Sequence, residues 1–133
     1  WLRLRQTYTY SDCRFRGDVQ FGNNRLPVVP RHAYRAELRL GGDALHIAPN
    51  VEWMPKGAMA DYANTTQTPG YALIGLSGGA QVMRGLDLFV DARNLTGKKA
   101  IGDISAVITA TASSAIYYPV EGRAIFGGFR VRF

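Results

Sequence analysis

The stretch RAIFGGFRVRF, residues 123–133, decides the fold. Phe129, Val131 and Phe133 share one parity, whereas two arginines occupy the other. A period of two places alternate side chains on opposite faces of a β-strand. A strand of about ten residues, apolar on one face and charged on the other, is the unit of a transmembrane β-barrel. The last strand of a β-sandwich has the same pattern, so the rest of the chain must separate the two alternatives.

Composition favours a single all-β domain. The 133 residues include 15 Gly, 7 Tyr and 6 Phe, and they contain no run of 18 apolar residues, which excludes a transmembrane helix. Gly, Thr and β-branched residues are scattered where a helix would need Ala, Leu and Glu. The net charge is +6. Because the basic residues are spread along the chain and not clustered with aromatics, we expect no nucleic-acid partner.

The first residues bear on cysteine chemistry and on domain organisation. Cys13 is the single cysteine, so neither an internal disulfide nor a cysteine-based metal site can form. The opening WLRLRQTYTY has no apolar core of a signal peptide and starts in mid-strand. We therefore expect residues 1–133 to be a fragment of a longer protein.

Six strand-like segments follow one another, and the connections between them alternate in length. The segments span about 1–13, 32–41, 44–54, 70–82, 86–95 and 123–133. Short turns at 42–43 and 83–85 alternate with long connections at 14–31, 55–69 and 96–122. Short turns at one end and long loops at the other are the plan of an outer-membrane barrel, with the long loops outside the cell.

The first short turn predicts a register. A two-residue turn at 42–43 pairs Leu40 with Leu45. The same register sets Arg35 opposite Asn50, so that apolar residues meet apolar ones and polar residues meet polar ones.

The second short turn requires three residues. A loop that ends on Gly85 in the left-handed conformation pairs Ala80 with Leu88. Phe89 then opposes Gly79, which sets a large side chain over a residue that has none.

Two local features of the sheet are also predicted. Pro49 lies within the third segment, and because proline cannot donate to a ladder we expect a bulge there. In the last hairpin, antiparallel pairing is expected to put Asp87 beside Arg132 and Asp91 near Arg130.

Charged side chains keep to one parity in every segment. Arg123, at a strand end where a long side chain can reach water, is the exception. The polar parity carries Arg3, Arg5, Arg35, Glu37, Arg39, Glu52, Asp87, Asp91, Arg93, Arg130 and Arg132. A lipid-facing arginine at mid-depth costs about 2–4 kcal/mol. We therefore expect the polar parity to face the interior of the barrel.

Three motifs resemble TonB-dependent outer-membrane receptors. They are NRLPVVPRH at residues 24–32, VDARNLTGKK at 90–99, and EGR at 121–123 before the aromatic-ended strand. These resemble the approach to a late barrel strand, the penultimate strand, and the final strand of those receptors. Gly97 stands where the family usually has an acidic residue.

The resemblance implies an all-β antiparallel meander of six strands, the last part of a 22-stranded barrel whose N-terminal plug domain is absent from residues 1–133. It implies active uptake of a scarce nutrient, most often a ferric siderophore, driven by TonB through the missing N-terminal part. It also implies contact with outer-membrane lipid and with the outer-membrane assembly machinery. That machinery is expected to read the terminal signal formed by Phe129, Val131 and Phe133.

Basic and aromatic residues in the expected extracellular loops are candidate ligand contacts. They are Arg25, Arg31, Tyr62, Asn64, Lys98, Lys99, Tyr117 and Tyr118. A basic, aromatic mouth suits an anionic ferric chelate. The alternative is a solvated surface with an aromatic girdle.

Catalytic and metal-binding patterns are weak. His32 and His46 are expected to lie far apart, as polar residues of a wet interior. Met54 and Met59 could be soft ligands for copper, or could simply pack within a loop. No nucleophile elbow, phosphate loop or metalloprotease helix appears in the sequence. We expect no catalytic residue, cofactor or enzyme activity, and a non-transporting barrel or adhesion module remains the alternative function.

Overall fold

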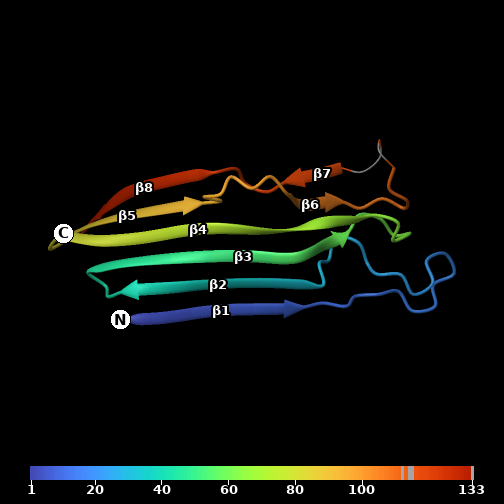
Figure 1. The fold of residues 1–133 in the computed structure, drawn as a ribbon, viewed down its shortest axis with the longest axis horizontal. Helices are drawn as coiled ribbons and strands as arrows, with labels where there is room; N and C mark the ends of the chain where they lie inside the picture. Colours follow the sequence, from blue (N-terminus) through green and yellow to red (C-terminus); the bar gives the residue numbers. More distant parts are fainter. Residues whose placement is uncertain (112, 114–115, 133) are drawn as a thin grey trace.

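The computed structural model describes residues 1–111, 113 and 116–132, which form one long antiparallel sheet and a small hairpin (Figure 1). The sheet consists, in order, of β1 (Leu2–Tyr10), β2 (His32–Gly41), β3 (Leu45–Met59), β4 (Gln67–Met83), β5 (Leu86–Arg93) and β8 (Ala124–Val131). The hairpin pairs β6 (Ile101–Ser105) with β7 (Ile116–Pro119). None of the described residues belongs to a helix long and apolar enough to cross a membrane.

The sheet is a meander with its connections sorted by length, as predicted. Figure 1 shows both chain ends and the two short turns at one end of the strands, and the long connections at the other. Two strands are longer than expected. β3 and β4 continue into the segment predicted as a loop, which leaves only residues 60–66 between them. β6 and β7 were not predicted, because their sequences IGDIS and IYYP are short and lack a clear alternation of polar and apolar residues.

The residues that alternate between polar and apolar in the sequence lie on opposite faces of the sheet. Leu4 pairs with Leu38 and Tyr8 with Tyr34, on the same face of β1 and β2. Large apolar side chains on this face are exposed, for example Phe129 at 70% in β8. A soluble sandwich would bury such a face against a second layer, whereas a barrel wall turns it to lipid.

The register of β2 and β3 differs by two residues from the prediction. Leu40 pairs with Ile47 and not with Leu45. The turn is wider than two residues, because Gly41 adopts a φ of 104° and the Gly42 amide donates to the Leu45 carbonyl at 3.0 Å. A shift of two residues leaves every side chain on its predicted face.

Pro49 causes no bulge, which corrects a second expectation. The register of β2 and β3 is the same on both sides of it, at Glu37–Asn50 and at Leu40–Ile47. The missing amide hydrogen interrupts the ladder without inserting a residue. The register shift in β3 lies further along, between Lys56 and Met59.

The β4–β5 pairing confirms the second hairpin. Ala80 pairs with Leu88, and Gly85 has a φ of 85°. Phe89 is the partner of Gly79, as predicted, but its ring leans over the other neighbouring strand: a Cβ added to Gly128 would lie 2.6 Å from the ring's Cζ. The space beside Gly79 is covered by a histidine of β3, His46.

Half of the predicted ion-pair ladder on β5 and β8 is present. Asp87 forms an ion pair with Arg132, as expected. Asp91 does not approach Arg130; it opposes Phe126 instead. In an antiparallel pair, a residue four positions further along one strand faces a residue four positions earlier on its partner. Since Asp87 faces Arg130, Asp91 faces Phe126, and the predicted pairing of Asp91 with Arg130 did not take this into account.

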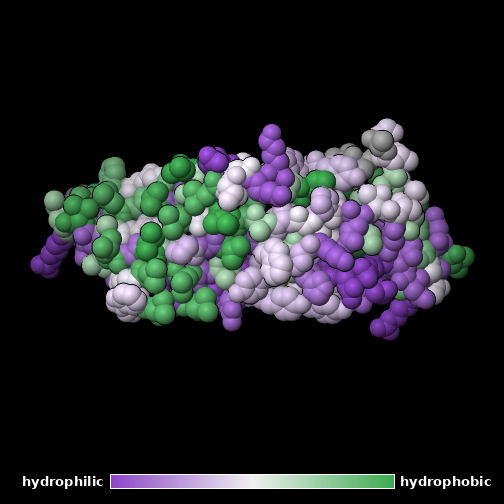
Figure 2. Space-filling view, in the orientation of Figure 1, coloured by the Kyte–Doolittle hydropathy of each residue, from purple (hydrophilic) through white to green (hydrophobic). Residues whose placement is uncertain are grey.

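Figure 2 shows how hydropathy is distributed on one face of the molecule. Hydrophobic residues gather over the part of the sheet near the short turns, and hydrophilic residues cover the part that carries the long connections. The buried hydrophobic cluster lies among those connections, where Ala58 and Ala60 meet Ile104. The strands therefore have the surface of a membrane wall, and the loops have a small core of their own.

Candidate functional site

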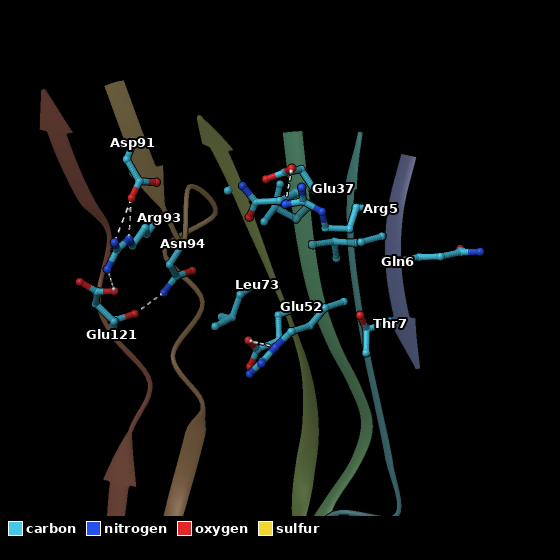
Figure 3. A pocket seen from close by; sticks show the side chains of 16 residues that line it. Arg5, Gln6, Thr7, Glu37, Glu52, Leu73, Asp91, Arg93, Asn94 and Glu121 are labelled. Atoms are coloured by element: carbon cyan, nitrogen blue, oxygen red, sulfur yellow. Dashed lines mark hydrogen bonds and ion pairs between the residues drawn. The ribbon is translucent and has the colours of Figure 1, made fainter. Parts of the chain in front are cut away.

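The polar face of the sheet is concave and forms a hollow of about 460 Å³ (Figure 3). It is lined by Arg5, Gln6, Thr7, Arg35, Ala36, Glu37, Asn50, Val51, Glu52, Leu73, Ile74, Gly75, Asp91, Arg93, Asn94 and Glu121. Gln6 contributes from the other parity and points away in Figure 3; it accepts a hydrogen bond of 3.1 Å from the Tyr34 hydroxyl. Because polar side chains gather on the concave side, this is the face that a closed barrel turns inward.

Ion pairs cross the strands on this inner face. Arg5 lies 3.6 Å from Glu37, and Arg35 lies 2.9 Å from Glu52. The Tyr71 hydroxyl also donates to Glu52, at 3.3 Å. The arginine side chains are about 70% exposed, so each pair contributes no more than about 1 kcal/mol. These contacts align neighbouring strands and give the wall a mixed charge.

Asn94, directly after β5, lines this hollow and was missed by sequence reasoning. It is 3% exposed and has a φ of 46°. Its amide group donates to the carbonyls of Lys98 and Glu121, at 2.9 and 2.8 Å, and accepts from the Lys98 amide at 2.8 Å. Asn94 therefore ties the start of the β5–β8 connection to its end. The Asn-Leu motif marked this position, but the spacing could not show its partner at 121.

Asp61 joins two long connections and was also missed. Its side chain is fully buried and accepts hydrogen bonds from the Thr65 hydroxyl and from the amides of Thr65, Thr66 and Ala110, the amides at 3.0 to 3.2 Å. Burial alone would raise the pKa of Asp61, but the Thr65 hydroxyl and the three amides outweigh it and hold the pKa below its ordinary value. A buried carboxylate with four donors fixes the loop that carries it.

Two of the predicted ligand contacts join the same loops. Asn64 has a φ of 59°; its side chain accepts from the Arg25 amide at 2.7 Å and donates to the Arg25 carbonyl at 2.9 Å. Tyr62 packs against Phe21 and Phe15, with ring centroids 5.4 and 6.0 Å apart. These contacts commit both side chains to holding residues 14–31 against residues 60–66.

Arg25 and Arg31 gather around one carboxylate. The Nε atoms of Arg14, Arg31 and Arg25 lie 2.9, 3.7 and 3.9 Å from the same Asp12 oxygen. The hydrogen bond from Arg14, with the charges of all three arginines, holds the pKa of Asp12 below its ordinary value.

The other four predicted contacts are more open. Lys98 and Lys99 are exposed beside Asn94, and Tyr117 and Tyr118 on β7 are 40% and 51% exposed. The structure therefore brings Arg25, Tyr62 and Asn64 together in one loop junction and keeps these four on the β5–β8 connection.

The remaining candidates are the residues of the terminal signal and the two histidines. Phe129 and Val131 are exposed on the apolar face of β8, and Phe133 lies outside the described residues. His46 is on the inner parity, but His32 is not in a wet interior: it accepts or donates a 2.7 Å hydrogen bond with the Tyr8 hydroxyl on the apolar face. Within the part of the chain that the structure describes, no group of three His, Cys, Asp or Glu side chains is placed to hold a metal ion.

Comparison with known proteins identifies a family for the chain. A model of the family described as TonB dependent receptor-like, beta-barrel matches residues 1–95. Among solved structures, the ferric-catecholate import receptor Fiu of E. coli K12 is similar, with a TM-score of 0.74 and 20% identity over 99% of this chain and 19% of its own. The siderophore receptor PiuA of Acinetobacter baumannii has a TM-score of 0.72 and 20% identity over 97% of this chain and 19% of its own.

No curated protein matches the chain. The chain spans about a fifth of the length of the two solved receptors, 19% in each case. At 20% identity these likenesses show a shared fold, while the family model covers well over half of the chain. Members of that family are transport receptors of the outer membrane. With its antiparallel meander, inward polar face and outward apolar face, this chain belongs to the β-barrel of the TonB-dependent receptors.

Proposed function

We propose that the chain is the C-terminal part of a barrel that takes up a ferric chelate with energy from TonB. The observation that carries this proposal is the family match over residues 1–95, on a sheet whose polar face is concave and whose apolar face is exposed. Residues 1–133 supply six strands of the wall; the plug domain and the segment that contacts TonB belong to the rest of the receptor. The role is transport, with no catalysis.

The proposed ligand is a ferric siderophore, because the solved receptors with this fold are described as importing a ferric catecholate and as a siderophore receptor. An anionic chelate fits the charge of the chain, which is +6. A non-transporting barrel or adhesion module would share the wall but not the dependence on TonB.

Growth under iron starvation tests the function. The intact gene, its deletion and a TonB deletion are compared on a panel of siderophores. We expect one siderophore to support growth of the intact strain alone. If copper, cobalamin or a sugar distinguishes the strains while no siderophore does, the iron assignment fails. Uptake that persists without TonB contradicts active transport.

Within the mouth, we propose that Lys98, Lys99, Tyr117 and Tyr118 contact the chelate, since their side chains are exposed on one connection. Exposed lysines attract an anion over a Debye length of about 8 Å at physiological salt. Replacing Lys98 or Lys99 by Gln should weaken chelate binding a few-fold, more at low salt than at high salt. Arg84→Gln makes the same charge change in the turn at the opposite end and should leave binding unchanged.

A further inference from the structure

The basic cluster at the loop end of β1 has more positive charge than its own carboxylate can neutralise. Three guanidinium groups, from Arg14, Arg25 and Arg31, lie within 3.9 Å of one Asp12 oxygen. The four side chains are 28–42% exposed, so the cluster is half-buried and still open to solvent. One negative charge among three positive ones leaves a net charge of +2.

Two further observations show that the cluster is electrostatically incomplete. Arg14 and Arg25 face each other in an isolated antiparallel bridge within the β1–β2 connection, an arrangement in which like charges destabilise each other. The Nε of Arg31 is buried and makes no hydrogen bond to any described residue, although it faces Asp12 at 3.7 Å. A second anion would relieve the repulsion and accept from these donors.

The cluster lies on the lipid side of the wall. Arg31 donates to the Tyr10 hydroxyl at 2.8 Å, and its guanidinium carbon is 5.5 Å from the centre of the Tyr10 ring. Tyr10 shares the outward parity of β1 with Leu4 and Tyr8, and both tyrosines are more than half exposed, at 54% and 60%. Tyrosines of this kind mark the level at which acyl chains give way to headgroups.

The order along β1 is therefore aliphatic, aromatic and then basic. Leu2 and Leu4 lie near the short-turn end and the tyrosines follow, while the three arginines of the cluster lie in the connection between β1 and β2. The anion present at this depth and on this side is a phosphate of a lipid headgroup. Arginine suits it, because a guanidinium offers paired donors to phosphate oxygens.

We propose that Arg14, Arg25 and Arg31 bind a phosphate group on the headgroup of an outer-leaflet lipid. The site lies on the outside of the barrel, so it is separate from the uptake route and does not rest on the proposed transport function. It assigns Arg25 and Arg31 to lipid and leaves the chelate to residues of the β5–β8 connection.

Native mass spectrometry of the full-length receptor tests the assignment, with bis-phosphorylated lipid A as the probe and dephosphorylated lipid A as its matched partner. We expect one phosphorylated lipid to be retained, and Arg25→Gln/Arg31→Gln to lower its retained fraction at least tenfold. Arg5→Gln/Arg35→Gln removes the same charge from the inner face and should have no effect. Equal retention of the phosphorylated and dephosphorylated lipids would overturn the proposal.

Asp12→Asn separates binding from folding. It removes the internal carboxylate and leaves all three arginines, so lipid retention should be unchanged or stronger. Loss of retention in this variant would mean that the arginines only shape the loop, and the proposal would fail. Heat-modifiable migration on gels confirms that each variant is folded.

Two soluble anions are alternative occupants. If inorganic phosphate binds as tightly as the lipid, the cluster is a site for a free anion and the lipid assignment is wrong. The same holds if Arg25→Gln/Arg31→Gln lowers ferric-chelate binding and leaves lipid A in place. Lys98→Gln/Lys99→Gln should give the opposite result, with reduced chelate binding and unchanged lipid retention.

Discussion

Asp61 connects two of the loops through its side chain. Its carboxylate lies at the junction of the β3–β4 turn and the β5–β8 connection and accepts four hydrogen bonds. Replacing it by Ala leaves three part-buried amides without their acceptor, and leaving a buried donor unsatisfied costs about 1–3 kcal/mol at most for each. A loop junction held by one carboxylate is rigid at neutral pH and sensitive to its protonation.

The lowered pKa of Asp61 predicts the direction of the pH effect. A carboxyl whose pKa is lower in the folded protein stabilises the fold above its unfolded pKa, close to 3.8, and this stabilisation is lost as pH falls through the folded value. We expect protection of the amides in residues 60–66 from hydrogen exchange to be constant from pH 7 to 5 and to fall below about pH 4.

Asp61→Asn is the matched control, since it keeps one acceptor oxygen and cannot ionise. Its protection factors should be lower at neutral pH and should not change with pH. If the unsubstituted receptor loses no protection at pH 3, the carboxylate does not hold the junction.

At the scale of elements, the β3–β4 hairpin is built around a close backbone approach. A Cβ on Gly70 would lie 2.2 Å from the Pro55 carbonyl oxygen and 2.4 Å from that of Met54. Backbone atoms cannot move aside as a side-chain tip can. Gly70→Ala should therefore lower the temperature of heat-modifiable migration by several degrees, whereas Gly127→Ala, with its nearest contact at 3.6 Å, should change it little. Equal effects of the two variants would mean that β3 and β4 do not approach each other closely at Gly70.

Cysteine cross-linking tests the pairing of β2 and β3. Ala36 is the partner of Val51, so Ala36→Cys with Val51→Cys should form a disulfide under mild oxidation. A two-residue turn would instead pair Ala36 with Pro49, and Ala36→Cys with Pro49→Cys should remain reduced. If only the second pair forms a disulfide, the register is that of the two-residue turn.

The limits of sequence reasoning are clearest at this scale. Side-chain parity in the strands of the six-stranded sheet was predictable, because polar and apolar residues alternate with the pleat. The register of β2 and β3 was not, because a shift of two residues preserves the parity and depends on the φ of Gly41. The same reasoning found the loops that bear the candidate site but missed Asp61 and Asn94, whose partners are 49 and 27 residues away.

At the scale of the whole molecule, the two ends of the strands have different tasks. At the end with the long connections, hydrogen bonds of Asp61, Asn64 and Asn94 hold the connections together. This end also presents charged and aromatic side chains. The end with the short turns carries both chain termini (Figure 1). A wall of this kind can change its loops without changing its strands.

The terminal segment gives the last prediction, which concerns assembly of the whole barrel. Phe129 and Val131 are exposed on the lipid face, so the apolar end of β8 contributes little to packing within the sheet. We propose that the outer-membrane assembly machinery reads Phe133 as an aromatic signal, and we therefore expect deletion of Phe133 from the full-length receptor to lower the folded amount in the outer membrane. Phe133→Tyr keeps the ring and should assemble normally, and Phe129→Ala, within the strand, should have a smaller effect than the deletion. The measurement is the fraction of heat-modifiable receptor in isolated outer membranes, and a normal fraction after the deletion would mean that the signal lies elsewhere.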